Sequence, residues 1–251
     1  MNPVLQDVSV AVGILLVLFI SLEAGFRIGR YAASRSDAGA GAQVGAVQGA
    51  LLGLLGLLLG FSFAAAGARF IERQDLIVSE ANAIGTAYLR ADRLDEPFRG
   101  ELKGAIRSYV EHRVQLTGRL REGFSAADGA DIDRLHQQMW SAAIAGVKNQ
   151  PGTMVSILPP LNDVIDLHST RLYAGMKHLP TIVMGLLVAS SMLSIGVIGY
   201  GHGTGGRRRA ALTVPLAIVI GVALWVTIDL DRPRAGLIQL NDLPLQSLKL
   251  Q

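Results

Sequence analysis

Four long apolar segments constrain the fold of this chain more than any other feature of its sequence. They occupy residues 8–24, 44–68, 181–200 and 210–228. A helix needs roughly 17 to 25 predominantly apolar residues to cross the hydrocarbon core of a bilayer, and each segment has that length. Backbone groups in the bilayer core must be hydrogen-bonded within the segment itself, so the sequence predicts four transmembrane helices.

The composition also indicates a membrane protein. Hydrophobic residues make up 50% of the 251 positions, and the mean hydropathy of +0.39 is high for a soluble domain. The absence of cysteine excludes disulfides and thiolate chemistry. Segment 8–24 is preceded by Asp7 and by no basic residue, and no small-residue cleavage pattern follows it. We therefore interpret it as a spanning helix rather than a signal peptide.

The polar segment between the second and third spans has a helical pattern. Between Arg69 and Pro180, fourteen Lys and Arg residues balance fourteen Asp and Glu residues. The segment is therefore neutral and offers no basic face for nucleic acid. No helix breaker follows the second span until Pro97. If the helix is unbroken over residues 45–94, it is about 75 Å long at about 1.5 Å per residue.

Three further helices are expected in the same segment. Apolar residues at helical spacing place them at about residues 96–121, 132–148 and 153–176. The stretch GFSAADGAD between the first two is typical of a loop, with Ser125 or Asp131 as the N-cap of the helix that follows. No strand-like alternation persists anywhere in the sequence.

The predicted fold class is therefore all-α. We expect an integral membrane protein with four transmembrane helices and a helical extramembrane domain inserted between helices two and three. The expected divisions are residues 1–68 (transmembrane helices 1 and 2), 69–179 (the continuation of helix 2 plus about three helices), 180–230 (transmembrane helices 3 and 4) and 231–251 (a C-terminal tail).

A stripe of glycines marks the second span. A glycine costs about 1 kcal/mol relative to alanine inside a helix, so a run of them needs a reason. Small residues let another helix approach closely in a membrane. Two interpretations stay open: packing against a helix of the same chain, or meeting of one helix per subunit around a symmetric axis. The glycines that form this packing stripe are Gly45, Gly49, Gly53, Gly56, Gly60 and Gly67.

Charged residues follow where the second span leaves the bilayer. Arg69, Glu72 and Arg73 are expected there as interface anchors. Further along, Glu80 and Asn82 lie on an otherwise apolar surface. They are either satisfied inside the helical bundle or line a polar cavity.

No catalytic or metal-binding constellation is visible. Asp163 and Asp166 share a helical face near His168, but two carboxylates alone are weak grounds for a metal site. The sequence contains neither an HExxH nor a GxSxG motif. We therefore expect no enzyme activity, no metal and no cofactor.

The positive-inside rule does not assign the sidedness. The two short hairpins carry six basic residues, Arg27, Arg30, Arg35 and Arg207 to Arg209, against three in the C-terminal tail, which favours cytoplasmic hairpins. Adding four basic residues at the membrane junctions of the helical domain reverses the tally to seven against six.

Two phrases of the sequence resemble bestrophins. GFSFAAAGARFIER resembles the end of the second bestrophin span, although Phe70-Ile71 replaces the family's paired tryptophan. DRPRAGLIQLNDLPLQSL resembles the tail of bacterial bestrophins, with the glycine of the Pro-x-Gly turn one place late. With EANAIGTAYLR, the whole chain resembles the bestrophin-like family of bacterial membrane proteins. The matching residues are Gly60, Phe61, Arg69, Phe70, Glu72, Arg73, Glu80, Asn82, Pro233, Asn241, Asp242 and Pro244.

The resemblance implies a pentameric, anion-conducting channel in the bacterial cell membrane, whose partners are lipid, small ions and copies of itself. Each second span would line the axis, and the Gly-Phe match places a hydrophobic neck at Gly53, Leu57 and Phe61. Glycine at position 53 would widen one ring, and the other two would gate by dewetting. Bestrophins also have a calcium clasp of clustered acids after the fourth span. Here Asp229 and Asp231 are too few to form one, so we do not expect gating by calcium.

An alternative is a non-conducting membrane sensor or scaffold whose helical domain binds a partner or a ligand. A monomeric four-helix unit would favour this second function, whereas a symmetric oligomer would favour the channel. The sequence gives no further feature that separates the two.

Overall fold

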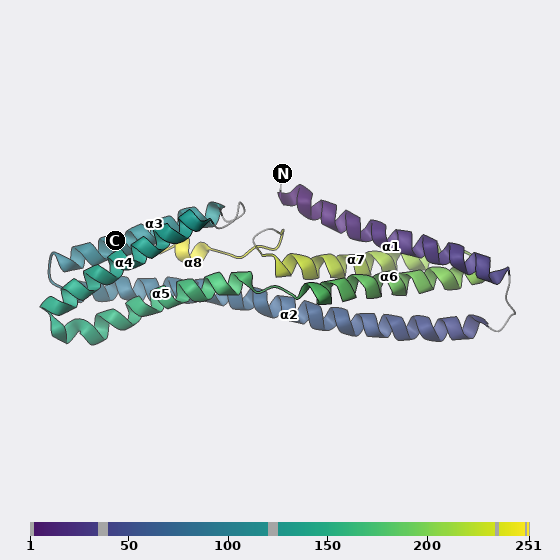
Figure 1. Ribbon diagram of the computed structural model, residues 1–251, viewed down its shortest axis with the longest axis horizontal. Coiled ribbons are helices and arrows are strands. Elements are labelled where there is room, and N and C mark those ends of the chain that lie inside the picture. The colour runs from purple at the N-terminus through teal and green to yellow at the C-terminus, as the bar shows by residue number, and fades with distance from the viewer. Residues whose placement is uncertain (1–2, 35–39, 120–124, 234–235, 249, 251) are drawn as a thin grey trace. The chain divides into compact units, whose positions relative to one another are not determined.

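The computed structural model describes residues 3–34, 40–119, 125–233, 236–248 and 250. In these ranges every regular element is helical and none is a strand, which confirms the all-α prediction (Figure 1). Four helices are long and apolar enough to cross a membrane. They are α1 (Pro3–Ala33), α2 (Ala40–Arg90), α6 (Thr181–Thr204) and α7 (Ala210–Asp231).

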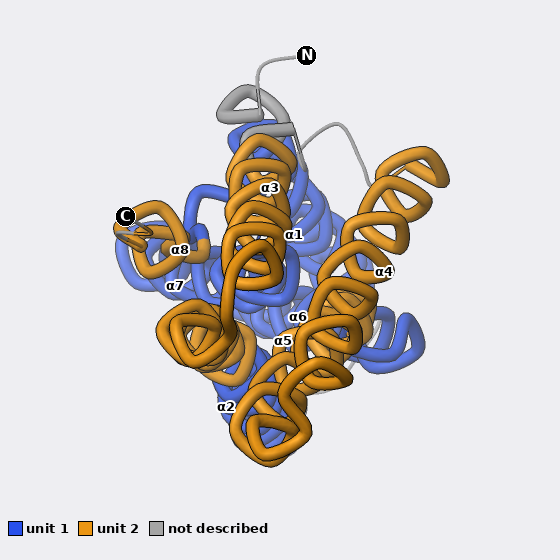
Figure 2. Tube along the Cα trace, turned by 90° about the vertical axis from the view of Figure 1, so that its left-hand side faces the viewer, with its two compact units in different colours: residues 1–70, 178–239 blue, residues 71–177, 240–251 orange. Residues whose placement is uncertain are grey.

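The chain divides into two compact units (Figure 2). Unit 1 comprises Met1–Phe70 and His178–Gln239, and unit 2 comprises Ile71–Lys177 and Leu240–Gln251. The long helix α2 contributes to both. The segment 231–251, expected to form one tail, is divided between the units after Gln239.

In unit 1, α1 and α6 pack backbone to backbone through glycines of both helices. Two Gly-x-x-x-Gly pairs allow this approach, since any side chain would collide with the facing helix. A Cβ atom would lie only 1.9–2.2 Å from a carbonyl oxygen of the facing helix at Gly25, Gly29, Gly199 and Gly203. The apolar core beside these helices includes Leu18, Leu55, Ile195, Ala217 and Leu224.

Unit 2 is a helical bundle. The end of α2 is followed by a short 3-10 turn (Ala91–Arg93) and then by α3 (Phe98–Arg119), α4 (Ala126–Asn149) and α5 (Met154–Met176). The short helix α8 (Leu243–Gln246) lies near the end of the chain. Their shared core includes Ile77, Ile84, Ile106, Met139, Leu161 and Leu245.

Helix α4 begins at Ala126, so the predicted loop is wrong for residues 126–131. The cause is a capping box, in which two side chains satisfy backbone N–H groups at the start of the helix. The Ser125 hydroxyl accepts from the Asp128 N–H at 3.2 Å, and the Asp128 carboxylate accepts from the Ser125 N–H at 2.9 Å. Of the two candidate N-caps, Ser125 is the one used.

Candidate functional site

The predicted neck row lies on the side of α2 that faces away from the core of unit 1. Leu57 is 55% exposed and Phe61 67% exposed, and Gly53 is also exposed. The opposite side carries Leu55 and Ser62, which are buried. The row is therefore free to meet something other than the described helices of its own chain.

The glycine stripe of α2 is open as well. A Cβ atom added at any of its six glycines, from Gly45 to Gly67, would meet no described atom within 4 Å. The stripe thus contrasts with Gly25 and Gly199, where a neighbouring backbone leaves no room. Among the described residues, the stripe therefore has no packing partner.

At the junction where the spans of unit 1 end, Asp231 gathers contacts from two other segments. Its buried carboxylate accepts the N–H of Leu179 at 3.0 and 3.1 Å. The guanidinium of Arg69 lies 3.5 Å from Asp231 Oδ1, and His178 Nδ1 lies 3.3 Å from Oδ2. This anchor ties the end of the spanning part of α2 to the end of α7 and the start of α6.

The second acid after α7 is also engaged by the protein. Asp229 is buried and accepts the N–H groups of Leu237 and Ile238 at 2.9 and 2.7 Å. A Cβ atom at Gly236 would lie 2.0 Å from Asp229 Oδ1, so a side chain at this position would displace the carboxylate from its two N–H donors. Residues 236–238 therefore lie against the Asp229 carboxylate, and two of their N–H groups satisfy it.

In unit 2, Arg73, which was expected as an interface anchor, contacts the end of α5. It is buried, and its side chain donates to the carbonyl oxygens of Ala174 (3.0 Å) and Lys177. These carbonyl groups lie at the C-terminus of α5, where a cation also meets the negative end of the helix dipole. Glu72, in contrast, is half exposed and lies 3.9 Å from Lys177.

Glu80 is the centre of a buried charged network in unit 2. Its carboxylate has no solvent exposure and accepts the Tyr109 hydroxyl at 2.7 Å. Arg113 contacts both carboxylate oxygens, at 3.2 and 3.4 Å, and Arg171 also donates to Glu80. Arg171 in turn lies 3.6 Å from Asp242. The positive charges of the two guanidinium groups thus balance the negative charges of the two carboxylates, and a charged group is tolerated in a protein interior when it is paired in this way.

The protonation of this network follows from its geometry. Glu80 lies beyond the apolar segment 44–68, inside the helical bundle. Burial opposes its charge, but the guanidinium groups of Arg113 and Arg171 outweigh burial and lower its pKa to about 2. Burial, together with the Glu80 charge, raises the pKa of Tyr109. The network therefore holds an ionised Glu80 and a neutral Tyr109 hydroxyl.

Two histidines pack beside this network. The rings of His136 and His168 are 5.2 Å apart, and Tyr109 lies 5.2 Å from His136 and 6.3 Å from His168. Burial, aided by Arg113, lowers the pKa of His168 to about 3. Buried nitrogens of both rings, Nε2 of His136 and Nδ1 of His168, have no hydrogen-bond partner among the described residues. Both rings are neutral packing groups at ordinary pH.

The NDLPL phrase docks onto unit 2. The Gln74 side chain donates to the Asn241 carbonyl at 2.9 Å and accepts the Asn241 N–H at 2.8 Å. Asp242 is buried near Arg171, and Leu245 enters the core. The structure therefore joins two phrases that the sequence places far apart, around Glu80 and around Asp242.

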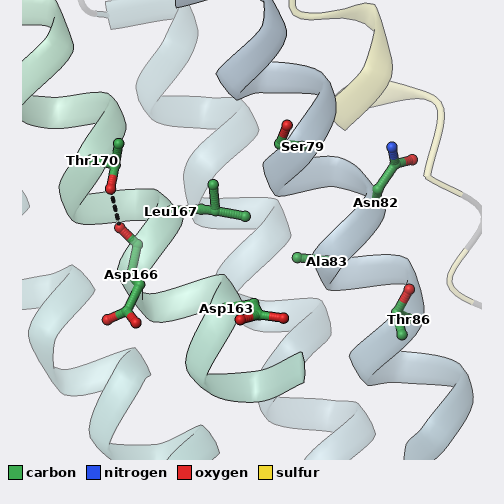
Figure 3. Close-up of a pocket in the computed structure, with 8 residues that line it drawn as sticks. All are labelled: Ser79, Asn82, Ala83, Thr86, Asp163, Asp166, Leu167 and Thr170. Atoms are coloured by element: carbon green, nitrogen blue, oxygen red, sulfur yellow. Dashed lines mark hydrogen bonds between the residues drawn. The ribbon is translucent and has the colours of Figure 1, made fainter. Parts of the chain in front are cut away.

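Asn82 lies outside this network, at the edge of an open polar pocket that is lined by residues of α2 and α5 in unit 2 (Figure 3). The pocket has a volume of about 550 Å³. Its lining side chains carry carboxylates, hydroxyls and one amide, and no basic group: Ser79, Asn82, Ala83, Thr86, Asp163, Asp166, Leu167 and Thr170.

The pocket belongs to a longer exposed face on the unit 2 part of α2. Glu72, Asp75, Ser79, Asn82 and Thr86 are all exposed and follow one another at intervals of three and four residues. Such spacing keeps side chains on one side of a helix. This face is therefore acidic at its start and polar beyond.

Comparison with known families agrees with this picture. The family model of the bestrophin-like domain matches residues 14–245, nearly the whole chain, and the chain belongs to this family. It is a membrane protein related to bestrophin channels, which confirms the resemblance seen in the sequence. No curated protein and no solved structure matches the chain.

Sequence reasoning singled out some residues of these clusters and missed others. It named Glu80 and Asp242 but did not predict their pairing with Arg113 and Arg171, because nothing in local spacing reveals a contact such as that of Glu80 and Arg171, 91 residues apart. The glycine pairs that join α1 to α6 have Gly-x-x-x-Gly spacing, which is a sequence signal for close helix packing but does not identify the partner helix.

Proposed function

We propose that the protein is a homo-oligomeric ion channel of the bacterial cell membrane, pentameric by its resemblance to bestrophins, with α2 of each subunit lining the axis. One observation carries the proposal: an exposed face of α2 holds Leu57 and Phe61 together with uncovered glycines, in a chain of a channel-related family. A contiguous exposed apolar face is typical of an interaction surface or a membrane contact.

The proposed neck gates ion flow by dewetting. Rings of Leu57 and Phe61 are apolar, so a narrow neck excludes water and ions until it widens. Gly53 adds no side chain and leaves its ring wide. The conduit then tapers from the glycine level to Phe61, which is the narrowest point because its side chain is the largest.

The proposal also concerns the sign of the conducted ion. The resemblance to bestrophins implies anions, and an apolar neck selects for neither sign. Beyond the neck, the register of α2 continues through Ala64 and Ala68 to Glu72 and Asp75, which are exposed. Carboxylates along a conduit raise the local concentration of cations, so these two residues act against anion selectivity.

Recording from planar bilayers that contain the purified protein tests the proposal. We expect single-channel currents, and Phe61→Ala should increase the open fraction because a smaller ring wets more easily. Phe63→Ala is the matched control, since Phe63 is exposed on the same helix at a different angle. An absence of current in both the wild type and Phe61→Ala, in protein shown to be folded, rejects the channel.

A second function is favoured by one observation, the polar pocket at Asn82 and Asp163. A sensor or scaffold would bind a ligand or a partner with this domain and conduct nothing. The particle mass in detergent separates the two functions. The mass of a pentamer supports the channel. The mass of a monomer excludes a conduit between subunits and favours the sensor or scaffold.

A further inference from the structure

An arginine cluster lies at one end of unit 1, formed by two segments far apart in the sequence. Arg27 and Arg30 belong to the last turns of α1, and residues 207–209, all arginine, connect α6 to α7. The guanidinium carbon of Arg208 lies 4.3 Å from the ring centre of Phe26, and its Nη1 lies 3.0 Å from Glu23. These contacts make the two segments one surface.

The backbone holds this surface in place. Gly206 has a φ of 68°, in the left-handed region that favours glycine, and it lies between the C-cap of α6 and the arginines. The N–H of Gly206 donates to Gly203 at 3.2 Å, and Gly203 itself packs against the backbone of α1. The connection is therefore a defined turn that rests on α1.

The cluster carries far more positive than negative charge. The two segments contribute five arginines, at positions 27, 30, 207, 208 and 209, and the described carboxylate that pairs with arginines of the cluster is that of Glu23. Glu23 pairs with Arg27 at 2.9 Å and with Arg208, and both arginines remain more than 60% exposed. Among the described residues, no carboxylate forms an ion pair with the other three. Arg35 and Asp37 lie outside the described residues.

The neighbouring helix end adds to this charge. α7 begins at Ala210 with no side chain capping its first turn, so its free N–H groups and the positive end of its dipole lie beside Arg209. Guanidinium groups and free helix N–H groups both match the oxygens of a phosphate. A phosphate is therefore the group that this surface fits.

The position of the cluster identifies the source of the phosphate. α1, α6 and α7 are all candidate membrane spans, and the arginines lie where these helices end or begin. Such positions coincide with the headgroup region of the bilayer, where basic residues attract anionic lipid. We propose that this arginine cluster binds the phosphate headgroups of anionic phospholipids. The proposal does not depend on ion conduction.

Lipid binding to the purified full chain tests this. The protein in detergent is equilibrated with equal amounts of phosphatidylglycerol and phosphatidylcholine, and bound lipid is measured by native mass spectrometry. We expect phosphatidylglycerol to be preferred, and the triple variant Arg30→Gln, Arg207→Gln, Arg209→Gln to lose about tenfold or more of that preference. The matched control removes the same charge from unit 2, with Arg93→Gln, Arg99→Gln and Arg134→Gln.

The outcomes are distinct. A preference that survives in the control but not in the cluster variant supports the proposal. Equal losses in the two variants overturn it, because net charge alone would then explain the binding. If the cluster variant does not fold, the wild type decides: no preference for phosphatidylglycerol, or its complete displacement by excess inorganic phosphate, overturns lipid recognition at this surface.

Discussion

At the scale of single residues, Glu80 shows how far a sequence can indicate a role without revealing it. A lone acid on an apolar helix face must be satisfied or must face a cavity, and that choice depends on residues from other helices. The structure supplies Tyr109, Arg113 and Arg171, from α3 and α5, so the acid is satisfied. Its neighbour Asn82 takes the other role and lines a pocket.

His168 gives the helical domain an acid-sensitive stability. It lies outside the apolar segment 181–200, and its pKa is about 3 in the folded state against an ordinary value of 6.5. Below pH 6.5 the unfolded chain therefore binds a proton that the folded chain does not, and stability falls as the pH falls. Burial and Arg113 both oppose protonation of the ring, and the Glu80 charge offsets only part of that cost.

Between pH 6.5 and 4.5, we expect the free energy of unfolding of the wild type to fall by about 2 kcal/mol more than that of His168→Phe, which has no histidine to protonate at this position. The range stays above the window from 4.5 to about 2 in which Glu80 itself loses its stabilising charge. Thermal unfolding followed by Trp140 fluorescence, in a Trp225→Phe background, measures it. A variant as acid-sensitive as the wild type would show that His168 is not the group responsible.

At the scale of elements, the sequence predicts most of what the structure contains. Long apolar segments and helical periodicity locate every spanning helix, because these signals are local. The start of α4 is mispredicted, since Gly129 and the small residues around Ser125 are also typical of a loop. Helix partners are harder to predict, because glycine stripes in α1, α2 and α6 look alike and only tertiary contacts distinguish them.

Two substitutions separate these stripes. Gly199→Leu should prevent unit 1 from folding, because even a Cβ atom would lie 2.1 Å from the Leu22 carbonyl oxygen. Gly56→Leu should leave the folded chain intact, since nothing described lies within 4 Å, but should weaken an assembly that packs on this stripe. Thermal unfolding and particle mass in detergent measure the two effects. An unchanged mass in folded Gly56→Leu protein would assign the stripe to lipid.

At the scale of the whole molecule, α2 carries both the residues of the proposed neck and the acidic residues beyond it. Its exposed face is apolar around Leu57 and Phe61 and acidic at Glu72 and Asp75. If five copies surround an axis, the apolar part controls whether ions pass and the acidic part controls which ions gather beside it. The acidic part is therefore a test of whether α2 lines the conduction path.

We expect the double variant Glu72→Gln, Asp75→Asn to shift the reversal potential in a KCl gradient toward the chloride equilibrium potential. Removing two carboxylates per subunit reduces the local cation concentration, and this holds whichever ion the wild type prefers. The control, Glu101→Gln with Glu111→Gln, removes the same charge from exposed positions on α3. A shift of equal size in the control, or none in the α2 variant, would exclude this face of α2 from the conduction path.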